Sequence, residues 1–103
     1  MFFSAATPES DVRRYAAMIG YESRRVALDT MKRDALRPGR ITNSMLVMGA
    51  ALDGCITLAE VHDTAGAYGT GAEIFEGTGH NMMLDDGWPV AEWIYSWLGE
   101  RRL

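Results

Sequence analysis

The chain has 103 residues, 48% of them hydrophobic, and a formal net charge of −4. This length suits one small domain, and this hydrophobic content suits a globular core rather than a disordered chain. The acidic balance argues against general nucleic-acid binding, which requires clustered Lys and Arg. Cys55 is the single cysteine, so an internal disulfide is excluded. With no signal-peptide start and no apolar run of roughly 20 residues, we expect a soluble cytoplasmic protein without a membrane span.

The N-terminal part of the chain predicts two helices. Thr7 can cap the first helix, Pro8 suits its first position, and Gly20 allows it to stop. A second helix is expected over residues 22–35, where apolar residues recur at helical spacing. The sequence Arg-Pro-Gly-Arg at 37–40 then breaks the pattern. We therefore expect residues 1–40 to form a helical segment of two helices.

The rest of the chain, residues 41–103, predicts a β-α-β-α unit of the α/β class. Residues 45–50 are almost wholly apolar and fit a buried strand, while residues 72–75 alternate and fit a second strand. Between them, Thr57-Leu-Ala-Glu60 has the pattern of a capping box, which marks the start of a helix. A last helix is expected over residues 88–98. Since a helix joins the two strands, they should be parallel.

Two residues suited to acid–base chemistry follow these strands. Asp53 follows the first strand, and His80 follows the second in the glycine-rich sequence Gly-Thr-Gly-His. The carboxyl ends of parallel strands meet at one edge of a sheet, so both side chains should lie there. Histidine can take and return a proton near neutral pH, and a carboxylate on its other nitrogen fixes the tautomer and stabilises the imidazolium. The spacing therefore predicts a catalytic pair.

Each of these residues also has a simpler interpretation. Asp53 could be an ordinary aspartate in a strand-to-helix turn, and His80 could be a loop histidine that caps the next helix. Cys55, two residues after Asp53, suggests a thiol nucleophile. We expect instead that Cys55 is buried and packs as a small hydrophobic residue.

Two further acidic motifs carry a simple structural interpretation. His62 and Asp63 resemble a metal-binding pair, but they fall within a predicted helix without a second histidine at a useful spacing. We expect them on an exposed helix face. Asp85 and Asp86 are expected to cap or precede the last helix. Because no glycine-rich phosphate loop with a basic residue is present either, the sequence predicts no cofactor and no metal.

The second half of the chain resembles the C-terminal part of α/β-hydrolase-fold proteins, in particular esterase, lipase and lysophospholipase-like members. The resemblance is carried by Leu-Val-Met-Gly-Ala-Ala-Leu-Asp at 46–53, Thr-Ala-Gly-Ala-Tyr-Gly at 64–69, Glu-Ile-Phe-Glu-Gly-Thr-Gly-His at 73–80, Met-Leu-Asp-Asp-Gly-Trp at 83–88 and Trp-Leu at 97–98. It implies that Asp53 is the acid and His80 the base of a catalytic triad. Residues 1–40 look like the end of the cap insertion of such proteins, and residues 41–103 like the C-terminal portion of their core.

The chain departs from this family because the motif that carries the family's nucleophile is absent from its sequence. The family's serine lies in Gly-x-Ser-x-Gly, and no serine of this chain has glycines on both sides at that spacing; the serines are Ser4, Ser10, Ser23, Ser44 and Ser96. The family's oxyanion-hole loop also lies N-terminal to the matched region. The resemblance thus implies a hydrolase of carboxylic esters or related acyl compounds that is inactive alone and needs a complementing, serine-bearing segment.

A second interpretation is a non-catalytic structural or interaction module. Two parallel strands leave sheet edges and an apolar face uncovered, and self-association into a homo-oligomer would cover them.

Overall fold

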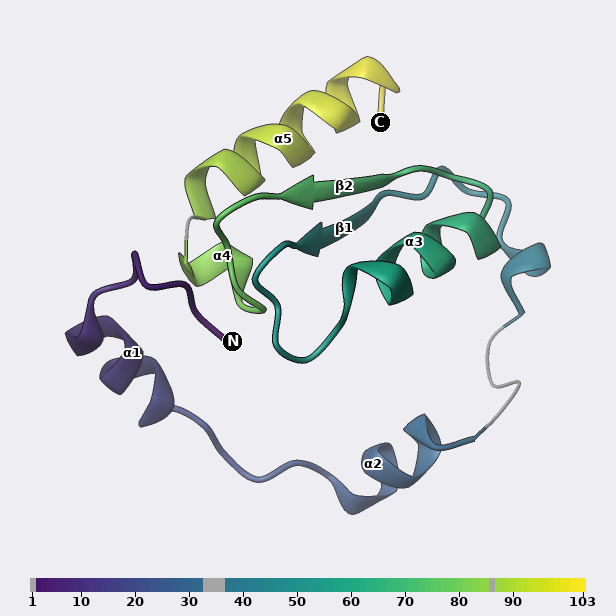
Figure 1. Ribbon diagram of the computed structural model, residues 1–103. Helices are drawn as coiled ribbons and strands as arrows, with labels where there is room; N and C mark the ends of the chain where they lie inside the picture. Colours follow the sequence, from purple (N-terminus) through teal and green to yellow (C-terminus); the bar gives the residue numbers. More distant parts are fainter. Residues whose placement is uncertain (1, 33–36, 86) are drawn as a thin grey trace.

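The computed structural model describes residues 2–32, 37–85 and 87–103 (Figure 1). The elements in chain order are α1 (Glu9–Ala16), α2 (Arg24–Thr30), the 3-10 helix η1 (Pro38–Arg40), β1 (Val47–Ala50), α3 (Leu58–Ala67), β2 (Ala72–Phe75), α4 (Met82–Asp85) and α5 (Gly87–Glu100). This order confirms a small α/β unit preceded by two helices. The short helix α4 is an addition that the sequence pattern does not predict. Within the described ranges, no helix is long and apolar enough to cross a membrane.

The two strands form a parallel pair, as the connecting helix predicts. Val47 pairs with Ala72 at one end of the ladder, and Ala50 pairs with Phe75 at the other. In Figure 1, α3 and α5 lie on opposite sides of the two strands, and the loops that leave both strands emerge at the same edge. The fold therefore places the residues that follow β1 and β2 next to one another.

Close packing of α3 on β1 depends on a glycine in the strand. A Cβ atom at Gly49 would lie 2.8 and 2.9 Å from the two Cγ atoms of Val61, so a larger residue would force the helix away from the sheet. The buried hydrophobic side chains of the described residues are Ala50, Val61, Ala65 and Val90. This core consists of small residues and is thin.

The helix α3 begins as the sequence predicts. Thr57 accepts a hydrogen bond from the backbone N–H of Glu60, and the Glu60 carboxylate accepts one from the backbone N–H of Thr57. This reciprocal pair satisfies two backbone donors that have no partner within the helix. His62 and Asp63 are exposed on α3, which confirms the simple interpretation of that motif.

The N-terminal helices are shorter than predicted. α1 begins after Pro8, which occupies the N-cap position, and the Thr7 hydroxyl is hydrogen-bonded to Asp85 instead of capping the helix. α2 ends at Thr30, whereas the prediction extended to residue 35; residues 33–36 lie outside the described ranges. Neither α1 nor α2 buries a residue, and short helices without tertiary packing are marginal in water.

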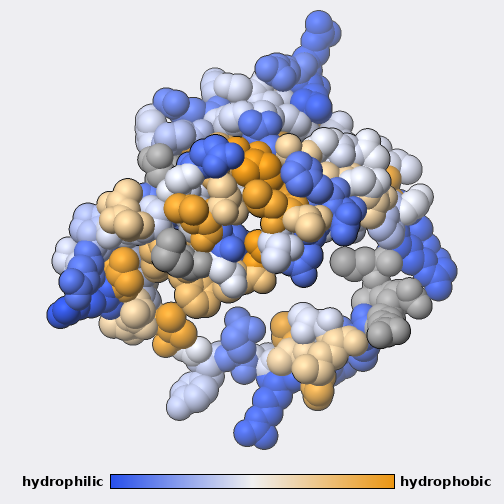
Figure 2. All heavy atoms as spheres, in the orientation of Figure 1, coloured by the Kyte–Doolittle hydropathy of each residue, from blue (hydrophilic) through white to orange (hydrophobic). Residues whose placement is uncertain are grey.

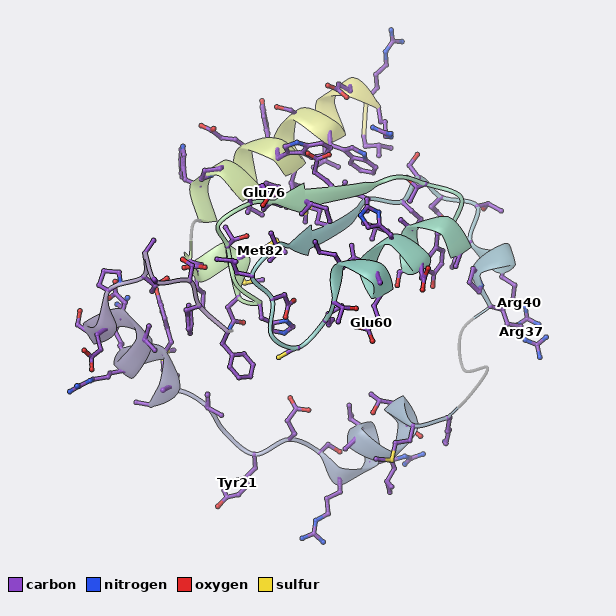
Figure 3. The ribbon with its side chains drawn as sticks, in the orientation of Figure 1. Tyr21, Arg37, Arg40, Glu60, Glu76 and Met82 are labelled. Carbon is purple, nitrogen blue, oxygen red and sulfur yellow. The ribbon has the colours of Figure 1, made fainter. Side chains whose placement is uncertain are left out.

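Hydrophobic side chains are exposed over this N-terminal region. Figure 2 shows them at the surface of the molecule, and Figure 3 shows Tyr21 pointing away from the rest of the chain. Met18, Ile19 and Met31 are each at least three-quarters exposed. These large apolar side chains therefore face solvent in the isolated chain.

Candidate functional site

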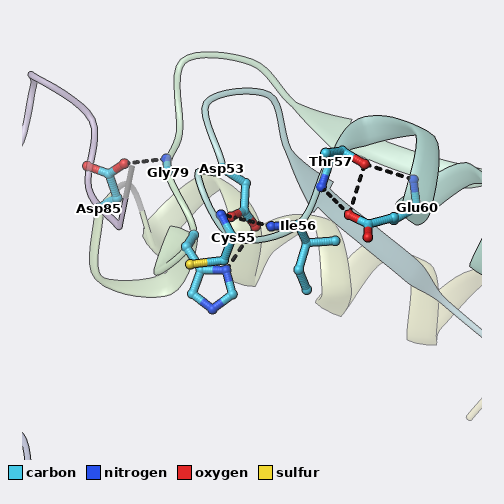
Figure 4. Close-up of polar contacts among 8 residues, drawn as sticks. Asp53, Cys55, Ile56, Thr57, Glu60, Gly79 and Asp85 are labelled. Atoms are coloured by element: carbon cyan, nitrogen blue, oxygen red, sulfur yellow. Dashed lines mark hydrogen bonds and ion pairs between the residues drawn. The ribbon is translucent and has the colours of Figure 1, made fainter. Parts of the chain in front are cut away.

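The first part of the site is the turn that follows β1. Asp53 Oδ1 accepts hydrogen bonds from the backbone N–H groups of Cys55, at 2.7 Å, and Ile56, at 3.0 Å (Figure 4). An aspartate that bonds its own backbone two and three residues later stabilises a tight turn and fixes its own rotamer. One carboxylate oxygen is therefore used to hold the turn, and the other, Oδ2, is left to face the second loop.

The second part is the loop that follows β2 and carries His80. Gly77 has a φ of 73°, a left-handed conformation that favours glycine. The buried Thr78 hydroxyl donates to the carbonyl of Phe75, and the Thr78 carbonyl accepts a hydrogen bond of 2.9 Å from the N–H of Leu52. The last of these bonds joins the two loops directly, so the site continues the β1–β2 ladder beyond its end.

The structure brings Asp53 and His80 together. His80 Nδ1 lies 2.9 Å from Asp53 Oδ2, and the two side chains are 34% and 8% exposed, respectively. An ionised carboxylate can only accept, so Nδ1 carries the proton of this bond and proton exchange falls to Nε2. The pair can therefore take a proton from an acidic group on its solvent side and return it.

The ionisation of Asp53 follows from its partners. Burial acts to raise the pKa of Asp53, but the hydrogen bonds from His80 and from the N–H groups of Cys55 and Ile56 outweigh it and lower the pKa below its ordinary value of 3.8. Asp53 is then a carboxylate at neutral pH. This charge can stabilise an imidazolium on His80.

The N-terminal segment packs against the His80 loop, which the sequence pattern does not reveal. The Phe2 ring meets the His80 ring edge-on, with centroids 5.8 Å apart and planes at 80°. The Phe2 carbonyl accepts a hydrogen bond of 2.9 Å from the N–H of Asn81. A Cβ atom at Gly79 would lie 2.9 Å from backbone atoms of Phe2 and Phe3. Gly79 thus lets the N-terminal segment approach the loop closely.

Asp85 fastens this contact. It comes just before the last helix, as the sequence predicts, and Asp86, the other residue of the motif, lies outside the described residues. Its Oδ2 accepts hydrogen bonds from the backbone N–H groups of Ser4, at 2.8 Å, and Gly79, at 2.7 Å, while Oδ1 accepts from the hydroxyls of Ser4 and Thr7. Burial acts to raise the pKa of Asp85, but these hydrogen bonds outweigh it and lower the pKa. Four donors converge on the Asp85 carboxylate, which therefore joins the N-terminal segment to the His80 loop.

Cys55 is exposed, so its expected role as a small buried hydrophobic residue is wrong. Its backbone N–H bonds Asp53 in the turn after β1 (Figure 4). The Cys55 sulfur, one Asp53 oxygen and one His80 nitrogen all lie within 4.8 Å of one another. A thiol is therefore part of this cluster.

No serine within residues 2–32, 37–85 and 87–103 has its hydroxyl hydrogen-bonded to His80. Ser4 is buried and its hydroxyl is bonded to Asp85. Comparison of the chain with protein-family models, with curated proteins and with solved structures gives no match in any of the three.

Proposed function

We propose that this chain supplies the acid–base pair of a serine-type α/β hydrolase that cleaves carboxylic esters or related acyl compounds. The observation that carries the proposal is the 2.9 Å contact between His80 Nδ1 and Asp53 Oδ2 at the carboxyl edge of a parallel strand pair. An imidazole held by a carboxylate at this edge is the arrangement that a hydrolase triad needs.

Each residue has a defined role in this proposal. His80 Nε2 takes the proton of a serine hydroxyl as the serine attacks the acyl carbon, and it then returns that proton to the leaving alcohol. Asp53 holds Nδ1 and stabilises the imidazolium between these two steps. The serine and the oxyanion-hole donors come from a complementing segment, either in a partner polypeptide or elsewhere in a longer parent chain.

The apolar surface of the chain supports a complementing segment. The buried core is small, and Met48 on β1 and Leu46 just before it are only half-buried. Large apolar side chains are exposed on α2 and in the segment between α1 and α2. Further strands beside β1 would bury part of this surface, with a gain of about 25 cal/mol per Å² of apolar area removed from water. We expect the isolated chain to hydrolyse esters hardly at all, since the residual rate of a damaged triad depends on an oxyanion hole.

Complementation tests the proposal. The chain is co-expressed with an N-terminal α/β-hydrolase segment that bears Gly-x-Ser-x-Gly, and the purified complex is assayed with a p-nitrophenyl ester. We expect activity that falls at least about 1000-fold in His80→Ala and is unchanged in His62→Ala, the matched control on the exposed face of α3. Formation of a complex whose esterase activity does not depend on His80 would refute the proposal.

The second candidate function is self-association as a structural or interaction module. It is favoured by the exposure of Ile19, which is 81% exposed, and of its apolar neighbours. In this case, a second copy of the chain would cover the apolar surface. Sedimentation equilibrium distinguishes the two: a concentration-dependent dimer supports self-association, and a monodisperse monomer over a wide concentration range contradicts it.

A further inference from the structure

We propose that Asp53, Cys55 and His80 form a binding site for a divalent transition-metal ion of the Zn²⁺ type. A carboxylate oxygen, the thiol sulfur and a ring nitrogen lie within 4.8 Å of one another. The sequence pattern predicts no metal site, because Asp53 and Cys55 are 25 or more residues from His80 in the chain and meet only in the fold. This inference is independent of ester hydrolysis.

The chemistry of the three donors selects the class of ion. Zn²⁺ accepts thiolate sulfur, imidazole nitrogen and carboxylate oxygen together, whereas Mg²⁺ and Ca²⁺ prefer oxygen ligands alone. Three protein ligands leave a fourth position open, as in zinc sites that bind water or a substrate rather than in closed structural sites. The cluster therefore fits a site that is open to an exogenous ligand.

The ligands are held by contacts that do not involve an ion. Asp53 Oδ1 is fixed by the N–H groups of Cys55 and Ile56. The backbone beside His80 is fixed by the Gly79–Asp85 hydrogen bond, and the Phe2 ring packs against the imidazole. Because these side chains are already held in place, they lose less conformational entropy when a metal ion binds.

Only small movements would complete the coordination. With Zn–S near 2.3 Å and Zn–N near 2.0 Å, ligand atoms of a tetrahedral site lie roughly 3.3–3.7 Å apart. The Cys55 side chain is exposed and can change its rotamer to bring the sulfur to this distance. As the ion binds, the thiol proton passes to solvent, while the Nδ1 proton of His80 is exchanged for one on Nε2, so the imidazole stays neutral.

Access to the site is open from the solvent. Cys55 is exposed and His80 is about one-third exposed, while Asp53 lies beneath them at 8% exposure. An ion can thus reach the thiol and the imidazole before it contacts the carboxylate. If the proposed hydrolase function also holds, the same ion would occupy the acid–base pair and inhibit it.

Titration of the tag-free, reduced chain with Co²⁺ tests the site directly. A thiolate bound to Co²⁺ gives a charge-transfer absorption band in the near ultraviolet, and Cys55 is the only cysteine, so the band reports this residue alone. We expect a saturable band with one ion per chain that Zn²⁺ abolishes by displacement. Cys55→Ser should remove the band, and His80→Ala should weaken Co²⁺ binding by at least about 10-fold.

Controls separate a site from adventitious binding. His62→Ala removes the other histidine of the chain, which lies exposed on α3, and should leave the titration unchanged. Asp53→Asn retains the shape of the side chain and should also weaken binding, with folding checked by circular dichroism. A chain that gives no band, gives a band with two chains per ion, or binds Co²⁺ equally well in His80→Ala would overturn the proposal. None of these outcomes depends on esterase activity.

Discussion

Ser4 and Asp85 are 81 residues apart in the sequence, yet the Ser4 backbone N–H and hydroxyl both donate to the Asp85 carboxylate, at 2.8 and 2.9 Å. The same carboxylate accepts a hydrogen bond from the N–H of Gly79, next to His80. One side chain thus fastens the N-terminal segment to the loop that carries the candidate base. The Phe2 ring, two residues before Ser4, lies edge-on to the His80 ring.

Removal of this carboxylate should release the N-terminal segment. Asp85→Ala leaves the N–H groups of Ser4 and Gly79 without their acceptor, which should lower the free energy of unfolding by about 1–3 kcal/mol. We expect faster amide hydrogen exchange at Ser4 and Gly79, measured by NMR. Asp63→Ala, an exposed change on α3, is the control. Unchanged protection at both amides would show that Asp85 does not hold the segment.

The stability of the chain should fall in acid. The hydrogen bonds of Asp53 and Asp85 hold the pKa of each carboxyl below its ordinary value of 3.8. A group whose pKa is lower in the folded state stabilises that state above its ordinary pKa, and the contribution is lost as the pH falls through the folded-state pKa. Urea midpoints should therefore decline from about pH 5 to about pH 2. The double variant Asp53→Asn/Asp85→Asn should show a flatter decline, and an equally steep one would contradict this assignment.

The parts of the fold that could be predicted are those set by neighbouring residues. The capping box of Thr57 and Glu60 places the start of α3 correctly, because both of its hydrogen bonds are local. The alternation over Ala72–Phe75 and the apolar run before Ala50 place the two strands. Topology then brings Asp53 and His80 to one edge.

The parts that could not be predicted depend on contacts between distant segments. Thr7 is a good helix cap by its residue type, but the Asp85 carboxylate binds its hydroxyl instead. Cys55 has the size of a core residue, but it lies in the turn that Asp53 forms and is exposed. No local pattern distinguishes Asp85 from Asp86 as the residue that would meet Ser4. Contacts between residues so far apart in the sequence can be seen only in the folded chain.

The capping box of α3 should contribute measurably to stability. Thr57→Ala removes the side-chain acceptor of the Glu60 N–H and should cost about 1 kcal/mol, which lowers the melting temperature by about 4–8 °C for a domain of this size. Circular dichroism on heating measures this change. Thr64→Ala, whose hydroxyl bonds a carbonyl within the same helix, should be nearly neutral. Equal effects of the two substitutions would argue against the capping role.

A side chain at Gly79 should separate the N-terminal segment from the loop. In Gly79→Ala, the new Cβ atom would lie 2.9 Å from backbone atoms of Phe2 and Phe3, and such overpacking typically costs about 1–3 kcal/mol. In Gly66→Ala, on the exposed surface of α3, nothing lies within 4 Å of the new atom, and alanine should stabilise the helix by about 0.5–1 kcal/mol. Urea denaturation of both variants should therefore give opposite signs, and a stabilised Gly79→Ala would contradict the close approach.

The tautomer of His80 reports directly on the geometry of the pair. Because Asp53 Oδ2 accepts from Nδ1 at 2.9 Å, neutral His80 should carry its proton on Nδ1 and leave Nε2 unprotonated. Long-range ¹H–¹⁵N correlation spectra distinguish the two nitrogens. Asp53→Ala should return His80 to a mixture of tautomers, while His62, exposed on α3, serves as the reference in the same spectrum. A proton on Nε2 in the unchanged protein would mean that His80 cannot accept a serine proton there, and the role proposed for the pair would fail.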